Sequence, residues 1–218
     1  MILFSRKSSA FTLIELLVVI AIIGILASLL FPAIGKAKSQ GDATFCANNA
    51  REVGLAVSMF ADDTDGSFPG SEHQGIANSW ISSLRAHGGT KGVYRCPSDR
   101  NTNRVASFAI NDFLLPALPG NPDYSKVSSI SCPCVTTTFP ECADKYDSSD
   151  HYHFALPDDG GYTPVAFESQ VAVKRHLNGA NYLYVDGHVE KVRWKQTVKL
   201  LTTDGSPFVD PGGLKKAP

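Results

Sequence analysis

The sequence lacks an excess of charge of either sign. Its 218 residues contain 20 Lys and Arg against 21 Asp and Glu, which gives a formal net charge of −1. A protein that binds nucleic acid needs clustered positive charge, so we expect no nucleic-acid partner. The composition is 43% hydrophobic and 19% charged, which excludes disorder of the whole chain. The mean hydropathy of −0.06 excludes a protein with many membrane spans.

Charge is also missing from one long stretch near the N-terminus. Residues 16–35 form an uncharged run of 20 residues, which is long enough for a helix to cross a bilayer. Because Arg6 and Lys7 precede the run, the positive-inside rule places residues 1–10 in the cytoplasm and the remaining chain in the periplasm or outside the cell. A cleaved signal peptide would have a shorter apolar region followed by a small-residue site, whereas here such residues come before the run.

One carboxylate, Glu15, stands at the start of this apolar stretch. A charge among lipid tails costs ~2.5–3.5 kcal/mol at the centre of a span and less near an end, and a simple anchor gains nothing from it. A neighbouring cation would explain the carboxylate. Cleavage after Ala10 would create such a cation, namely the free α-amino group of Phe11 in an adjacent subunit.

Residues 10–15 (AFTLIE), the apolar run and Pro32 together resemble the N-terminus of type IV pilins and type II secretion pseudopilins. The resemblance implies that a prepilin peptidase cuts between Ala10 and Phe11 and methylates the new amine. It also implies that Glu15 pairs with a neighbour's N-terminus during assembly, with Pro32 in its family position. One departure is Ala10, since the family usually has Gly before the cut.

Later motifs narrow this resemblance. His176 is followed, nine residues on, by Asp186-Gly187, which resembles the H-X9-DG domain that accompanies pilin-type N-termini in planctomycetes and verrucomicrobia. Further matching motifs lie at 46–49 (CANN), 53–56 (VGLA), 60–63 (FADD), 65–69 (DGSFP) and 96–99 (CPSD). The resemblance implies a pilin-like scaffold rather than a reaction.

The residue pattern predicts an α+β fold with a small antiparallel sheet, and the resemblance implies that this fold is pilin-like. Apolar residues recur every three or four positions between Ala43 and Phe60, which indicates the second half of one long helix over 11–61. Pro32, Gly35 and Gly41 are positions where this helix can loosen. Two strands, 182–185 and 188–192, are predicted to meet at a type I′ turn, and 79–87 to form a short helix. The expected core aromatics are Trp80, Phe108, Phe113, Tyr182, Tyr184 and Trp194.

The expected organisation has five parts. They are a prepilin leader over 1–10, a transmembrane and filament-core helix over 11–35, an amphipathic helix half over 36–61, a periplasmic α+β domain over 62–201 with the H-X9-DG hairpin, and a loose tail over 202–218. Within the domain, residues 115–164 are rich in Pro, Ser, Thr, Asp and Gly and are predicted to be mostly loop.

Two groups of residues suggest metal binding. Asp62, Asp63 and Asp65 offer clustered oxygen ligands, so calcium is a candidate cofactor. The glutamate that ends a twelve-residue calcium loop is missing, however, and a helix end followed by a turn at Gly66 explains the same residues. The second group, His176, Asp186 and His188, suits a divalent metal. A hairpin turn and a structural hydrogen bond would explain it without chemistry.

All five cysteines follow the apolar run, so an oxidising compartment favours disulfides. Cys46 is a candidate partner for Cys96, and Cys142 for either Cys132 or Cys134, which leaves one cysteine over. Cys132 and Cys134 are too close to bridge each other without strain. The alternative is zinc bound among Cys132, Cys134, Cys142, His151 and His153, a spacing that fits no common zinc template.

These features predict a structural, non-enzymatic subunit of a type II secretion pseudopilus or a type IV pilus-like filament. It would cross the inner membrane once, with its globular domain in the periplasm before assembly. The expected partners are other pilin or pseudopilin subunits, the prepilin peptidase and methyltransferase, the inner-membrane assembly platform and membrane lipid. The alternative is a membrane-anchored, non-polymerising surface module that binds calcium, a glycan or a protein. An enzyme using His176 and Asp186 ranks last, because no nucleophile motif accompanies them.

Overall fold

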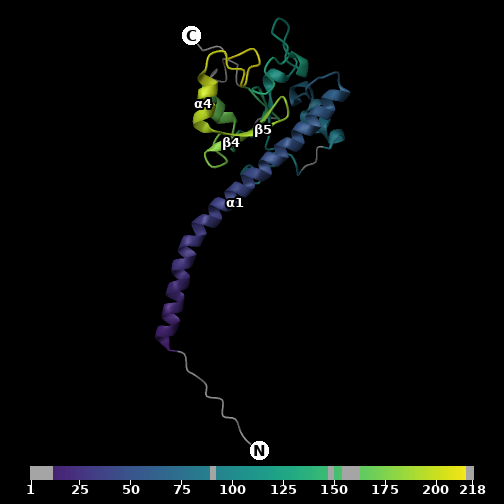
Figure 1. Ribbon diagram of the computed structural model, residues 1–218. Helices are drawn as coiled ribbons and strands as arrows, with labels where there is room; N and C mark the ends of the chain where they lie inside the picture. The colour runs from purple at the N-terminus through teal and green to yellow at the C-terminus, as the bar shows by residue number, and fades with distance from the viewer. Residues whose placement is uncertain (1–11, 89–91, 147–149, 154–162, 215–218) are drawn as a thin grey trace, which may run out of the picture. The chain divides into compact units, whose positions relative to one another are not determined.

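The computed structural model describes residues 12–88, 92–146, 150–153 and 163–214, and these divide between two compact units, residues 1–39 and 40–218. Ala10 and Phe11 lie outside the described residues. The elements are α1 (Leu13–Asp63), η1 (Glu72–Gln74), η2 (Ile76–Asn78), α2 (Trp80–Ser83), η3 (Leu84–His87), β1 (Ile110–Asn111), η4 (Asp112–Leu114), η5 (Val127–Ser129), β2 (Thr137–Pro140), β3 (His151–Tyr152), α3 (Pro164–Gln170), β4 (Gly179–Tyr184), β5 (Val189–Arg193) and α4 (Trp194–Thr202) (Figure 1).

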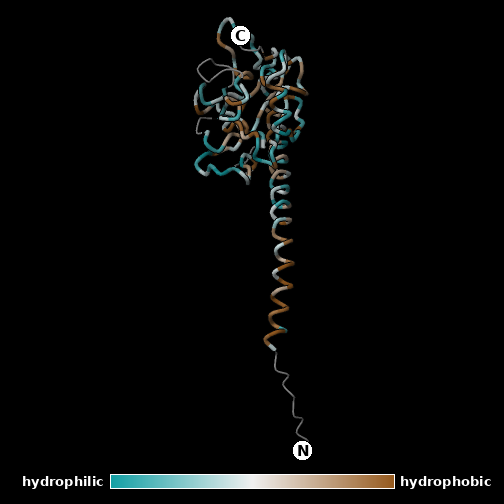
Figure 2. Tube along the Cα trace, turned by 90° about the vertical axis from the view of Figure 1, so that its left-hand side faces the viewer, coloured by the Kyte–Doolittle hydropathy of each residue, from teal (hydrophilic) through white to brown (hydrophobic). Residues whose placement is uncertain are grey.

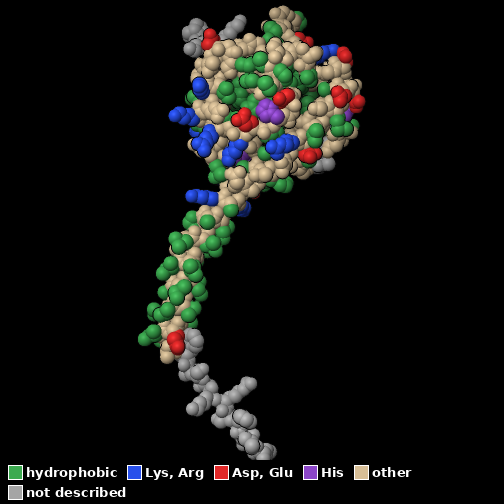
Figure 3. Space-filling model, in the orientation of Figure 1, with side chains coloured by type: hydrophobic (Ala, Val, Ile, Leu, Met, Phe, Trp, Pro, Cys, Tyr) green, Lys and Arg blue, Asp and Glu red, His purple; other side chains and the backbone are tan. Residues whose placement is uncertain are grey.

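The long N-terminal helix is confirmed, and α1 continues through Pro32 without a break. In the first unit its large apolar side chains are exposed, with 79% of Leu13 and 72% of Phe31 accessible. Figures 2 and 3 show these hydrophobic residues around the N-terminal part of α1. In the described part of the chain, α1 is the one helix long and apolar enough to cross a membrane. The sequence therefore builds an apolar surface that the first unit does not itself cover.

In the second unit, α1 contributes a buried stripe to the core, as its 3.6-residue periodicity predicts. Ala43, Cys46, Ala50, Val53 and Val57 are all buried. The helix lies close to the sheet at Gly54, where an added Cβ would come within 2.9 Å of a methyl carbon of Leu183. Asn181 of β4 also donates a 2.9 Å hydrogen bond to the main-chain oxygen of Ala43. The helix is thus packed against the sheet and hydrogen-bonded to it.

The main sheet is antiparallel and has the strand order β2-β4-β5, while β1 and β3 form a separate parallel pair. Because side chains alternate across a strand, β4 serves two cores. Leu183 packs with the α1 stripe, and Tyr182 and Tyr184 pack on the opposite side with Phe208. The α+β class with a long helix on a small antiparallel sheet is therefore as predicted.

Two sequence expectations concern the outer parts of this unit. Residues 115–164 were expected to be mostly loop, and most of their described residues do lie outside helices and strands; the short strands β2 and β3 also fall in this segment, and β2 pairs along the sheet with β4. The tail after 202 was expected to be loose, yet Phe208, Val209 and Leu214 are buried. These apolar side chains hold the segment, because they belong to the same core as side chains of α3, β4 and β5, with the Phe208 ring 5.3 Å from that of Tyr182.

The expected short helix and core aromatics are found. The segment 79–87 forms α2 and η3, with Trp80 and Leu84 fully buried. Phe108, Tyr182 and Tyr184 are buried as well, while Phe113 and Trp194 are half-buried at the edge of the core. Trp80 packs edge-on against Tyr94 and Phe139, which joins α2 to β2.

Candidate functional site

The N-terminus of α1 carries a capping box. The main-chain N–H and the hydroxyl of Thr12 both donate to Oε2 of Glu15, at 2.9 and 2.6 Å, and the Glu15 N–H donates to the Thr12 hydroxyl at 3.2 Å. Such a box satisfies main-chain donors that have no partner inside the helix. Glu15 therefore already has a local structural role, and the hydrogen bonds of that role use only one of its two oxygens.

The apolar segment that follows Glu15 satisfies its one side-chain hydroxyl within the helix, as a segment surrounded by lipid requires. Its one hydroxyl within 16–35, Ser28, donates to the main-chain oxygen of Ile25 at 2.7 Å, so it presents no unsatisfied hydrogen. Pro32 removes one helical donor, a change that membrane helices tolerate better than soluble ones do. Pro32, Gly35 and Gly41, where the helix can loosen, do not interrupt it, since α1 is continuous over all three.

A buried polar cluster in the second unit surrounds His176. Its Nε2 lies 2.8 and 3.1 Å from the two carboxylate oxygens of Glu141, and both side chains are fully buried. Arg175 donates to the same carboxylate at 3.0 Å. Burial would raise the pKa of Glu141, but His176 and Arg175 outweigh it and hold that pKa below its ordinary value. Glu141 is therefore an ionised, paired carboxylate in the core.

Two cysteines complete this polar cluster, which we define as Cys46, Cys96, Glu141 and His176. One ligand atom from each lies within 4.8 Å of the others, and all four residues are buried. A hydrogen bond with Cys46 lowers the pKa of Cys96 to about 7, and the same bond together with burial raises the pKa of Cys46. Burial alone would lower the pKa of His176, but Cys96 and Glu141 raise it to about 9. The cluster joins α1 to the entry of β4.

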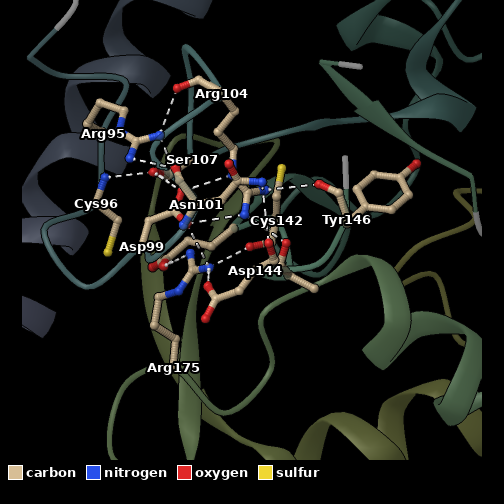
Figure 4. A network of polar contacts seen from close by, with 12 residues as sticks. Arg95, Cys96, Asp99, Asn101, Arg104, Ser107, Cys142, Asp144, Tyr146 and Arg175 are labelled. Carbon is tan, nitrogen blue, oxygen red and sulfur yellow. Dashed lines mark hydrogen bonds and ion pairs between the residues drawn. The ribbon is translucent and has the colours of Figure 1, made fainter. Parts of the chain in front are cut away.

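A second carboxylate, Asp99, lies next to Arg175 in a network drawn in Figure 4. Its oxygens lie 3.1 Å from Arg104 and 3.5 Å from Arg175, and the Ser107 hydroxyl donates to it at 2.6 Å. Ser107 in turn accepts from the Cys96 N–H at 2.9 Å. The CPSD motif at 96–99 therefore places one cysteine in the polar cluster and one carboxylate among arginines.

The spacing from His176 to Asp186-Gly187 has a structural explanation. Leu177 and Asn178 both have positive φ, 53° and 64°, and form a tight turn in which His176 and Gly179 exchange main-chain hydrogen bonds. Strand β4 follows directly and ends at Tyr184. The two ends of the motif thus mark the turns that enter and leave β4.

The turn at Asp186-Gly187 is not the expected type I′. A type I′ turn needs positive φ at both central residues, but here only Gly187, at 86°, has it. The Gly187 N–H donates to the Tyr184 oxygen, and Tyr184 donates to His188, so the loop is a β-turn followed by a left-handed glycine. Asp186 accepts from the N–H of His188 and contacts its ring at 2.6 Å.

The residues singled out for metal binding are not brought together as predicted. His176 is in the buried polar cluster, whereas Asp186 and His188 pair with each other at the surface. Asp63 pairs with His87 at 3.0 Å and Asp65 with Lys126 at 2.6 Å. In the described residues, none of Asp62, Asp63 and Asp65 belongs to a group of three or more converging metal ligands. Calcium at that loop stays a prediction.

The structure brings Cys46 and Cys96 together but not the other three cysteines. Cys46 and Cys96 lie together as free thiols in the polar cluster, so their pairing stays a prediction. Cys132 and Cys134 are exposed, whereas Cys142 is buried and its main-chain oxygen accepts from Arg175, and none of the three joins a converging group among the described residues. The alternative zinc set is therefore divided, and only its two histidines share a cluster.

The central acceptor of the polar cluster, Glu141, was missed by sequence reasoning, as was Arg175. Glu141 lies in the Pro- and Cys-containing stretch that predicted loop, and nothing local marks it as buried. Arg175 does adjoin His176, and a basic residue beside a buried histidine is a weak signal for a nearby carboxylate. Asn49 of α1 is also buried, and it donates to the Arg95 oxygen at 2.8 Å.

Comparison with known proteins identifies the N-terminal segment. Residues 5–31 match the family described as Prokaryotic N-terminal methylation motif, a type IV pilin-like signal. This motif implies processing by a prepilin peptidase and assembly with pilin-like subunits. Together with the one long apolar helix, it fits a membrane-anchored protein. No curated protein and no solved structure matches the chain.

Proposed function

We propose that this protein is a structural subunit of a type II secretion pseudopilus or a type IV pilus-like filament. The observation that carries the proposal is the match of residues 5–31 to the N-terminal methylation motif, followed by a helix with a single carboxylate at its start. In this proposal the prepilin peptidase cuts after Ala10, the new amine of Phe11 is methylated, and the inner-membrane platform assembles the mature chain. The second unit would be periplasmic, with residues 1–10 cytoplasmic before cleavage.

The exposed apolar surface of α1 supports this role. Large aliphatic side chains on all sides of the helix from Leu13 to Ile34 are 44% exposed or more. Burying apolar surface contributes roughly 25 cal/mol per Å², so such a segment needs lipid or other apolar helices around it. The same surface can serve both states, first in the membrane and later in the core of a filament.

The geometry of Glu15 supports the assembly step. Its Oε2 accepts both hydrogen bonds from Thr12, so Oε1 can accept from an ammonium group supplied by another chain while the cap stays formed. A buried carboxylate is costly when unpaired and much less so when paired. A subunit would therefore be stable in a dry filament core only where the amine of Phe11 from a neighbour lies against Glu15. This requirement would set the stagger between subunits.

The test is mass spectrometry of the intact chain and its N-terminal peptide, on protein from native membranes. The expected result is a chain that starts at N-methyl-Phe11. A chain that still starts at Met1 would contradict the proposal and would favour the membrane-anchored binding module. An Ala10→Gly variant serves as a control, because it restores the residue usual before the cut and should be processed at least as completely.

A further inference from the structure

Three histidines from distant parts of the sequence meet at the surface of the second unit. His73 lies in η1, His151 lies in β3, and His153 follows that strand. The Nε2 atoms of His151 and His153 are 2.8 Å apart, and those of His73 and His153 are 3.4 Å apart. One nitrogen from each ring lies within 4.8 Å of the other two. His151 is buried, His153 is half-buried and His73 is exposed, so the cluster is open to solvent on one side.

The other ring nitrogens of two of these histidines face carboxylates. Nδ1 of His151 lies 3.2 Å from Asp150, and Nδ1 of His153 lies 3.1 Å from Asp112. An ionised carboxylate only accepts hydrogen bonds, so each Nδ1 carries the proton in this network. A neutral ring of that tautomer presents a lone pair at Nε2. Two such lone pairs repel each other at 2.8 Å, so the contact is stable only with a metal ion between them or with a proton on one of the two nitrogens.

The surrounding structure holds the three rings in place. The Asp150 carboxylate accepts from the Ser79 hydroxyl and, at 3.1 Å, from the Glu72 N–H, and its main-chain oxygen accepts from the Trp80 indole at 2.7 Å. These bonds fasten the segment that carries His73 to the strand that carries His151. The N–H of His153 donates to the Gln170 side chain of α3 at 2.8 Å. The three rings are thus positioned by η1, β3 and α3.

We propose that His73, His151 and His153 bind one divalent transition-metal ion, zinc by preference, through their Nε2 atoms. Zinc–nitrogen bonds of ~2.0–2.1 Å in a tetrahedron put the nitrogens ~3.3 Å apart, and the 3.4 Å separation already fits. The 2.8 Å pair would open by about half an ångström. Asp112 and Asp150 act as the carboxylates that orient metal-binding histidines in many sites. Three protein ligands leave a fourth position for water or for a ligand from another molecule.

The choice of metal follows from the ligands. Neutral imidazole suits zinc, copper and nickel, whereas calcium and magnesium prefer oxygen ligands. The proposal is separate from the filament function, since it concerns residues that α1 does not contribute. It also differs from the zinc set suggested by the sequence, because the exposed pair Cys132 and Cys134 takes no part and His73 replaces them.

The test uses the full-length chain in detergent micelles, freed of metal with a chelator and then titrated calorimetrically with Zn²⁺. His73→Gln removes one ligand at an exposed position, and far-UV circular dichroism checks that the variant is folded. We expect the wild-type chain to bind one equivalent of zinc tightly. The His73→Gln variant should bind that equivalent at least tenfold more weakly. His188→Gln is the matched control, because that exposed histidine also contacts a carboxylate but lies outside the cluster.

Two further measurements test the role of Asp112 and the type of ligand at the metal. Asp112→Asn leaves all three rings in place and should weaken zinc binding 10–100-fold. Co²⁺ in place of zinc should give tetrahedral visible bands without a thiolate charge-transfer band, which separates this site from the cluster with Cys46 and Cys96. A wild-type chain that binds no zinc would overturn the proposal. Binding unchanged by His73→Gln, or carrying the thiolate band, would do so as well.

Discussion

Nε2 of His176 lies 2.8 Å from a carboxylate oxygen of Glu141, and solvent reaches neither side chain. The two residues are 35 positions apart: Glu141 directly follows β2, and His176 belongs to the turn that enters β4. Their contact, extended by Arg175, makes the core of the second unit depend on an ionic interaction as well as on apolar packing.

His176→Ala should destabilise the second unit strongly. The substitution leaves Glu141 buried with Arg175 as its remaining cation, and losing one partner of a buried pair costs ~3–5 kcal/mol. Because Arg175 remains, we expect the lower end, about 3 kcal/mol, from denaturant unfolding followed by tryptophan fluorescence. His188→Ala, at the exposed end of the same motif, should change stability by less than about 0.5 kcal/mol. Equal effects of both variants would refute the role of the buried pair.

In the reduced protein, the stabilisation that His176 contributes should fall as the pH rises from neutral to alkaline. The pKa of His176 is raised from 6.5 to about 9, so its charged form is favoured in the folded state. This contribution is complete below about 6.5 and is lost as the pH rises through about 9. The measurement is the difference in unfolding free energy between wild type and His176→Gln at several pH values. That difference should shrink over this interval, and a constant difference would contradict the assignment.

Leu177→Gly should stabilise the protein. Leu177 has a φ of 53°, which costs a residue with a side chain ~1–2 kcal/mol, and about half of its surface is exposed, so little packing is lost. We expect a gain of about 1 kcal/mol in unfolding free energy, seen as a rise in Tm of a few degrees. Gly179→Ala is the opposing control, since its Cβ would lie 2.6 Å from the Val192 main-chain oxygen and should destabilise. A lower Tm for Leu177→Gly would count against strain at this turn.

Cys46 and Cys96 should be joined by a disulfide in protein taken from an oxidising compartment. Their sulfurs lie within 4.8 Å of each other, and the pKa of Cys96, lowered to about 7, makes its thiolate available for oxidation. Peptide mapping without reduction should recover the two cysteines in one linked pair, and Cys132 and Cys134 should react with a thiol reagent. Full labelling of Cys46 and Cys96 in the unfolded, unreduced chain would show that they stay free.

Glu15→Val should leave membrane insertion intact and abolish filament assembly. The variant removes the only carboxylate of the apolar segment, so insertion costs less while the neighbour's amine loses its partner. Membrane fractionation and electron microscopy of surface or overproduced filaments measure the two outcomes. Thr12→Val is the control, since it removes the hydroxyl of the capping box and keeps the carboxylate, and it should still assemble. Normal filaments from Glu15→Val would disprove the pairing.

The sequence predicted the parts of the fold that have a regular period. The stripe from Ala43 to Val57 repeats every three or four residues and is the buried face of α1, and the alternation in 182–192 is the β4–β5 hairpin. The strand β2 was missed because its residues, Thr137–Pro140, do not alternate and are buried throughout. The segment up to Leu214 was missed for a related reason, since its few apolar residues show no period at all.

The polar sites were less accessible to sequence reasoning, because their residues are far apart in the chain. His176 was recognised from its spacing to Asp186, but its real partner is Glu141, in a stretch that predicted loop. His151 and His153 were considered with nearby cysteines, whereas the third ring comes from His73, 80 residues before His153. Short-range spacing identifies turns and helix faces, and contacts across such separations need the fold.

Strand β4 lies between the two turns of the His176 motif and contributes side chains to both cores of the second unit. Its length determines which side chains reach α1 and which reach the opposite core, with Leu183 on one side and Tyr182 and Tyr184 on the other. Adding or removing one residue between His176 and Asp186 would exchange the two sets, because faces alternate with every residue. The spacing between His176 and Asp186 can therefore change by two residues, or by one residue that a β-bulge takes up, without exchanging the two faces of β4.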